Sequence, residues 1–110
     1  MEIASLLSDI EYGDTKPAIK VLFNNAAVKE IRIVFKKGQE MMEHKTSYPI
    51  VVEIVDGRID FGVSGTLHRL DKGMLIALDA DVPHNLVALS DSIVRLSLNK
   101  ADTVERVQQV

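Results

Sequence analysis

The sequence contains no cysteine, so the chain can form neither disulfide bonds nor thiolate metal ligands, and a cysteine nucleophile is excluded. It also lacks any apolar run that approaches the ~20 residues of a membrane-spanning helix. The N-terminus, MEIASLLSDIEYGD, has neither the basic start nor the apolar run of a signal peptide. We therefore expect a cytoplasmic protein without a membrane partner.

A strong charge imbalance is absent as well. The 110 residues carry a formal net charge of −3, and the only adjacent basic pair, Lys36 and Lys37, is followed at once by Gly38. Such a pair is typical of a solvated loop end, and we expect no nucleic-acid partner. A chain of this length can bury one core but not two, so we predict a single domain over residues 1–110.

Valine and isoleucine are abundant and account for 23 of the 110 residues. They lie in short runs separated by turn residues, of which Asp56-Gly57 is the clearest, because a tight hairpin turn favours positive φ. The predicted strands are AIKVLF (18–23), VKEIRIVF (28–35), PIVVEIV (49–55), RIDFGV (58–63), TLHRL (66–70), GMLIAL (73–78), HNLVAL (84–89) and SIVRLSL (92–98). Short strands at regular spacing predict an all-β sandwich or barrel.

The run VKEIRIVF shows the strand period of two most clearly. Ile31, Ile33 and Phe35 fall on one face, and Arg32 and Val34 fall on the other. This period of two predicts a β-strand over residues 28–35.

The two ends of the chain have a helical pattern instead. Apolar residues at helical spacing, closed by Gly13, predict a short N-terminal helix, and an extended arm is the alternative. These residues are Ile3, Leu6, Leu7 and Ile10. At the other end, DTVERVQQV offers Asp102 as an N-cap with Glu105 three residues later, which predicts a short terminal helix.

The chain has three histidines, His44, His68 and His84. Taken alone, each is typical of a structural or surface residue, and no motif surrounds His68. The other two stand in recognisable frames of glycine residues.

The frame of His44 resembles the first motif of the cupin family, which consists of small double-sheet jelly-roll barrels. That motif has Gly, five residues, His-x-His, three or four residues, Glu, six residues and Gly. Here it falls on Gly38, His44, Thr46, Ile50 and Gly57. Both glycines and the first histidine match, whereas Thr46 replaces the second histidine and Ile50 replaces the glutamate.

The frame of His84 resembles the second cupin motif, which has Gly, five residues, Pro-x-Gly, two residues, His, three residues and Asn. Here it falls on Gly73, Asp79, Asp81, His84 and Ala88, of which Gly73 and His84 match. The resemblance covers about residues 28–98. It implies a cupin-type double-stranded β-helix, a jelly-roll barrel, and it also implies a homodimer.

The resemblance further implies that a metal-binding member holds its ion with three histidines and one glutamate. This chain keeps His44 and His84, and neutral imidazole suits Fe, Mn, Ni, Cu or Zn. Two imidazoles without a carboxylate make a weak site. We predict either no cofactor or a weakly bound divalent transition metal at this pair. Glu40 shares strand parity with His44, either as an added ligand or as a solvated loop residue.

Strand alternation also predicts the wall of a ligand pocket inside the barrel. The predicted pocket residues are Met42, His44, Thr46, Ile50, Val52 and His84, with Leu75 and Leu96 beside them. A mostly apolar cavity with two imidazoles and one hydroxyl suits a small organic ligand, and it suits a packed core as well.

We therefore predict that the protein binds a small molecule in the barrel without a tightly held catalytic metal. The alternative is a metal-dependent enzyme of the dioxygenase or isomerase type that uses His44 and His84 as ligands. A third hypothesis is a metal-free enzyme of the sugar-epimerase kind, with a pocket histidine as base and Tyr48 as the nearest acid. A regulatory role that acts through a separate partner is a further alternative.

Overall fold

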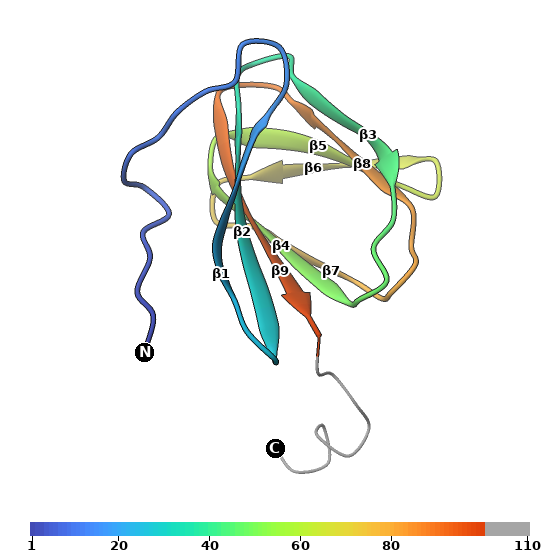
Figure 1. The fold of residues 1–110 in the computed structure, drawn as a ribbon. Coiled ribbons are helices and arrows are strands. Elements are labelled where there is room, and N and C mark those ends of the chain that lie inside the picture. Colours follow the sequence, from blue (N-terminus) through green and yellow to red (C-terminus); the bar gives the residue numbers. More distant parts are fainter. Residues whose placement is uncertain (101–110) are drawn as a thin grey trace.

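Nine strands form two antiparallel sheets in residues 1–100, the part of the chain that this computed structural model describes (Figure 1). The strands are β1 (Ala18–Asn24), β2 (Val28–Phe35), β3 (Glu40–His44), β4 (Ile50–Asp56), β5 (Arg58–Val63), β6 (Thr66–Asp71), β7 (Leu75–Leu78), β8 (His84–Ala88) and β9 (Ser92–Asn99). One sheet has the order β1-β2-β9-β4-β7 and the other β3-β8-β5-β6. The predicted all-β barrel is confirmed, with a strand in each predicted run.

The inner faces of the two sheets supply one apolar core. Phe35, Ile54, Ile59 and Phe61 have no exposed surface at all. The five-stranded sheet provides Phe35 and Ile54, whereas β5 of the other sheet provides Ile59 and Phe61. Removing this apolar surface from water is the main stabilising term of such a fold.

The turn between β4 and β5 is formed where the sequence predicts it. Gly57 has a φ of 90°, which favours glycine over any residue with a side chain. A Cβ at this position would also clash with the Ser92 side chain and with the Asp91 carbonyl. The Gly57 position therefore allows β5 to start directly beside the β8–β9 turn.

The strand β2 buries both of its faces. Ile33 and Phe35, which share one face of the predicted alternation, belong to the core, and Ile31 packs against it. On the other face Arg32 and Val34 are also buried, with 4% and 2% of their surface exposed. The N-terminal arm, residues 1–13, covers this face, because the Arg32 guanidinium donates hydrogen bonds to its main chain.

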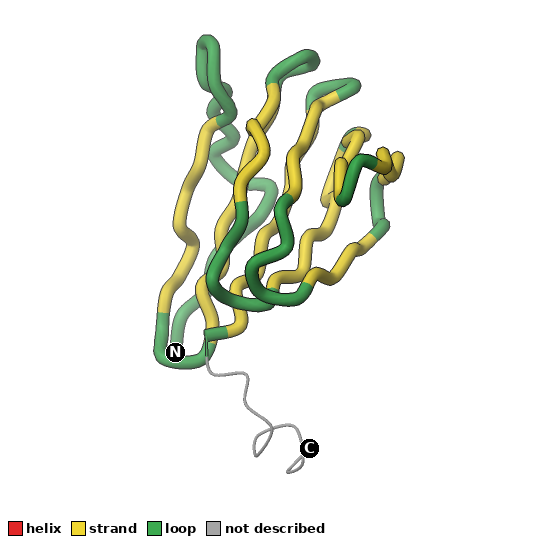
Figure 2. The backbone as a smooth tube through the Cα atoms, turned by 90° about the vertical axis from the view of Figure 1, so that its right-hand side faces the viewer, coloured by secondary structure: helices red, strands yellow, loops and turns green. Residues whose placement is uncertain are grey.

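The predicted N-terminal helix is wrong, and the arm is irregular along its whole length (Figure 2). The carbonyls of Ser5, Ser8 and Asp9 accept hydrogen bonds from Arg32. In a helix the Ser5 carbonyl would instead accept from the Asp9 amide. The tertiary contact with Arg32 thus replaces the local one. The helix predicted from Asp102 onward lies outside the described residues.

No helix of the described residues is long and apolar enough to cross a membrane.

Candidate functional site

The pairing of β3 with β8 brings His44 and His84 together. The two residues are direct cross-strand partners, and their ring centroids lie 4.4 Å apart with 60° between the ring planes. His84 is almost fully buried, with 2% of its surface exposed, whereas His44 is half-buried at the rim. The pair predicted from two separate motifs is therefore one cluster in the fold.

Main-chain carbonyls orient both imidazole rings. His44 Nδ1 lies 2.8 Å from the Met42 carbonyl oxygen, and His84 Nδ1 lies 2.9 Å from that of Val82. A carbonyl oxygen can only accept, so we assign the proton of each neutral ring to Nδ1. Each Nε2 then keeps a free lone pair, the arrangement that second-shell carbonyls impose on histidines that bind ligands or metals.

The buried ring is also held in place by an aromatic side chain. The Phe61 ring stacks on His84 with 5.4 Å between centroids and an angle of 6°. Burial lowers the pKa of His84; the hydrogen bond to the Val82 carbonyl opposes this, and the nearby His44 adds to the lowering. His84 is therefore neutral at pH 7 and is a hydrogen-bond acceptor at Nε2.

The space beside the two histidines is very small. Its volume is about 10 Å³, and it is lined by Ile33, Met41, His44, Val52, His84, Leu86, Val94 and Leu96. This volume holds about one water molecule. The expected apolar cavity for an organic ligand is thus filled by the protein's own side chains.

Met42 does not belong to this group, and that part of the predicted pocket is wrong. Its side chain is 75% exposed, and Met41 faces the core instead. The register of β3 against β8 shifts between Met41 and His44, so Met42 and Glu43 together face Asn85 alone. This β-bulge adds one residue to β3. The side chains before His44 therefore point to the opposite face from the one that simple alternation predicts.

The same shift removes Glu40 as a candidate ligand. Glu40 is exposed and lines a hollow on the outer surface of the β3-β8-β5-β6 sheet together with Met42, Glu43 and Asn85. The interpretation of Glu40 as a solvated residue is therefore the one that the structure supports.

The two residues that replace the cupin ligands do not provide a charged or imidazole ligand. Ile50 is 2% exposed and packs in the core beside Val52, which is equally buried. Thr46 Oγ1 donates a hydrogen bond of 2.8 Å to the Tyr48 carbonyl. Its hydroxyl proton is used within the loop, and Tyr48 lies in the same exposed loop.

Other residues considered from the sequence lie away from the pair. Leu75 is 60% exposed and faces outward opposite Glu53, whereas Leu96 does line the small cavity. His68 is exposed on β6. Asp81 has a φ of 64° and its amide donates to the Thr46 carbonyl, which ties the two loops beside the histidines together.

The comparison with solved structures decides the fold. A crystal structure of an RmlC-like cupin protein from Desulfovibrio desulfuricans matches with a TM-score of 0.85 at 19% identity, covering 91% of this chain and 97% of that chain. The chain has the cupin fold. An RmlC-like cupin from Shewanella frigidimarina matches with a TM-score of 0.70 at 22% identity, covering 86% of this chain and 92% of that chain.

A cupin 2 conserved barrel domain protein from Leptotrichia buccalis also shares the cupin fold. It matches with a TM-score of 0.75 at 27% identity, covering 83% of this chain and 44% of that chain. No protein-family model matches the chain, and no curated protein matches it significantly. The cupin fold predicted from the two glycine frames is confirmed.

The side chains of this cupin fold do not suit a tightly held metal ion. In the described residues no group of three or more His, Cys, Asp or Glu side chains could hold an ion. Only the two imidazoles converge, and zinc enzymes usually supply three protein ligands. The carboxylate that would offset the charge of the ion is replaced by the buried hydrocarbon of Ile50.

Two residues of this site could not be predicted from the sequence. Phe61 stacks on His84, and Met41 lines the cavity. The alternation of Ile59 and Phe61 in RIDFGV places Phe61 on the core face, but the alternation does not say which histidine it meets. The Met41 position depends on the bulge, for which the sequence has no signature.

Proposed function

We propose that this cupin-fold chain binds a small molecule through the His44–His84 pair without a tightly held catalytic metal. The observation that carries the proposal is that main-chain carbonyls orient two neighbouring rings, which leaves a free acceptor at the Nε2 of each.

The chemistry of the pair defines the class of ligand. Two neutral imidazoles accept hydrogen bonds at Nε2, so they suit a hydroxyl or amine group of the ligand. The cavity beside them, of about 10 Å³, has room for one such group but not for an organic body. The body of the ligand therefore stays outside, against the half-exposed face of His44.

The second candidate is a metal-dependent enzyme of the dioxygenase or isomerase type. The two free Nε2 atoms favour it, because carbonyl-oriented histidines are the usual ligands of transition metals. The described residues bring only two protein ligands together, which argues against tight metal binding and therefore against this candidate. A weakly bound divalent ion is compatible with the first proposal as well.

A fragment titration tests ligand binding. We would record saturation-transfer NMR spectra of small alcohols and amines with the wild-type protein, His44→Ala and, as a matched control, His68→Ala. We expect at least one fragment to bind the wild type and the His68 variant but not the His44 variant, because His68 is exposed on β6. Equal binding to all three proteins would contradict the proposal.

Metal content decides between the two candidates. Elemental mass spectrometry of protein purified without an affinity tag is compared with the double variant His44→Ala/His84→Ala. We expect a substoichiometric metal content that the double variant does not change. Close to one equivalent of a transition metal, lost in the double variant, would favour the enzyme.

The homodimer and the cytoplasmic location stay predictions. Light scattering of the purified protein tests the first, and cell fractionation tests the second.

A further inference from the structure

A row of three cations crosses the outer face of the five-stranded sheet, on the side away from the histidines. Lys20 on β1 is the cross-strand partner of Arg32 on β2, and Arg32 is the partner of Arg95 on β9. Neighbouring strands are about 4.8 Å apart, and like charges in opposed positions are destabilising. Such a row requires negative charge nearby.

Arg95 has that charge within the protein. Its Nε lies 3.4 Å from Glu53 and 4.0 Å from Glu30, so two carboxylates surround this one guanidinium. The Glu30 carboxylate also accepts a hydrogen bond from the Ser97 hydroxyl, which fixes its position beside Arg95.

Arg32 has no such partner. It is 4% exposed, and among the described residues no carboxylate forms an ion pair with it. Its Nη1 and Nη2 atoms donate to the carbonyls of Ser5, Ser8 and Asp9, at 3.3, 2.7 and 3.3 Å. Its Nε is buried without any hydrogen-bond partner. A buried cation with an unpaired donor is costly, and arginine cannot lose its proton.

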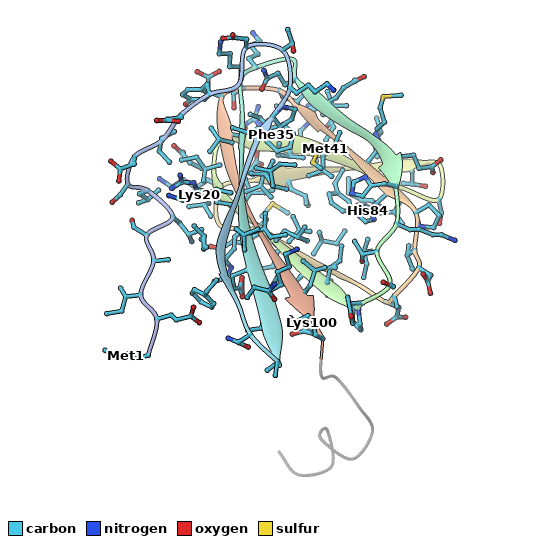
Figure 3. All side chains as sticks on the ribbon, in the orientation of Figure 1. Met1, Lys20, Phe35, Met41, His84 and Lys100 are labelled. Atoms are coloured by element: carbon cyan, nitrogen blue, oxygen red, sulfur yellow. The ribbon has the colours of Figure 1, made fainter. Side chains whose placement is uncertain are left out.

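A hollow of about 350 Å³ opens beside this guanidinium, between the N-terminal arm and β1. It is lined by Asp9, Glu11, Ala18, Ile19, Lys20, Arg32 and Val34. Figure 3 shows Lys20 on the side of β1 that faces the arm. Lys20 is exposed, so its ammonium group is accessible from solvent.

We propose that this hollow binds a small oxyanion, a phosphate or carboxylate group, between the Lys20 ammonium and the Arg32 guanidinium. Charge-assisted hydrogen bonds from these two groups are the strong ones that proteins use for such ligands. The anion supplies the direct charged partner that Arg32 lacks, since no carboxylate of the hollow forms an ion pair with it. Asp9 and Glu11 oppose it, which makes the affinity modest.

A phosphate titration followed by backbone amide shifts tests the site. Inorganic phosphate is added at constant ionic strength to the wild type, to Lys20→Gln and to Lys37→Gln, a matched control on the exposed β2–β3 turn. We expect shifts confined to the arm and residues 18–20. We also expect about tenfold weaker binding for Lys20→Gln, and unchanged binding for Lys37→Gln.

A second variant should change the phosphate affinity in the opposite direction. Glu11→Gln removes a repelling carboxylate from the hollow, so we expect phosphate to bind about threefold more tightly. Phosphate binding that weakens in this variant would mean that Glu11 supports the bound anion instead of repelling it, which overturns the proposed arrangement. A parallel titration with acetate shows whether a carboxylate is accepted as well as a phosphate, and either anion supports the site.

Two further outcomes overturn the proposal. Equal affinity of the wild type, Lys20→Gln and Lys37→Gln would show an adventitious ion only. Shifts spread over Lys36 and Lys37 instead of the arm would show the same.

Discussion

His84 inside the barrel and Arg32 under the N-terminal arm are both almost fully buried, yet the protein satisfies them by different means. The imidazole can shed its proton, so burial lowers its pKa and one carbonyl is enough to hold the ring. The guanidinium keeps its charge and uses three carbonyls from a segment that the barrel itself does not contain. The buried group inside the barrel can therefore be neutral. The buried group on the outer face, in contrast, is permanently charged and is covered by the N-terminal arm.

The largest effect is expected inside the barrel. Phe61→Ala removes a fully buried ring that packs on His84, and we expect a loss of about 3–5 kcal/mol in the free energy of unfolding. Urea denaturation measures it. Phe23→Ala on the edge strand β1 is the matched control, with a smaller loss because Phe23 is only half-buried. Equal losses would contradict the difference between core and edge.

Outside the barrel, Arg32→Met separates the arm from the sheet. Three hydrogen bonds are lost, but the freed carbonyls can bond water, so we expect a loss of about 1–3 kcal/mol. Limited proteolysis should cut the arm faster in this variant while the barrel stays intact. Unchanged cleavage of the arm would show that Arg32 does not hold it.

A smaller effect is expected from pH. The pKa of His84 is lowered in the folded state, so the unfolded chain binds the proton at higher pH than the folded chain. The free energy of unfolding should therefore fall as the pH drops through the unfolded value, about 6.5, towards the lowered folded value. Urea denaturation on both sides of that pH measures the slope. His84→Gln should flatten it and His68→Ala should not; a slope unchanged in His84→Gln would exclude His84 as its origin.

The smallest effect on stability is expected at Arg95, the member of the cation row that has carboxylate partners. Glu53→Gln removes one of the two carboxylates beside Arg95, and both side chains are partly solvated. We expect a loss of no more than about 1 kcal/mol, measured by urea denaturation in low and high salt. A larger loss would mean that the row depends on Glu53 more than the geometry indicates.

Most of the fold could be predicted because every strand except β3 has a local signature in the sequence. The predicted bounds of β2 and β5 match those of the structure, since alternating apolar residues are flanked by turn residues such as Gly57. The meeting of His44 and His84 was predictable from the glycine frames around them. These features depend only on residues close in sequence or on a resemblance of motifs.

The features that could not be predicted depend on contacts between residues that are distant in the sequence. The bulge that turns Met42 outward arises from the register of β3 against β8. The burial of Arg32 arises from an arm that crosses the sheet, whereas the alternation shows only that Arg32 lies on the face opposite Ile33 and Phe35. The volume beside the histidines is set by how closely eight side chains pack, and packing cannot be derived from strand pattern.

The strand pairs of this fold are nested: β5 pairs with β6, β4 with β7, β3 with β8, and β2 with β9. Each pair encloses the previous one in the sequence, as in one long hairpin that has been folded over. Once an inner pair has formed, the loop that the next pair must close is effectively shorter, and the entropic cost of closure falls. The Ser64-Gly65 turn, where both residues have positive φ, lies at the centre of this nest. We therefore expect refolding to start at this turn and the barrel to close outward strand by strand.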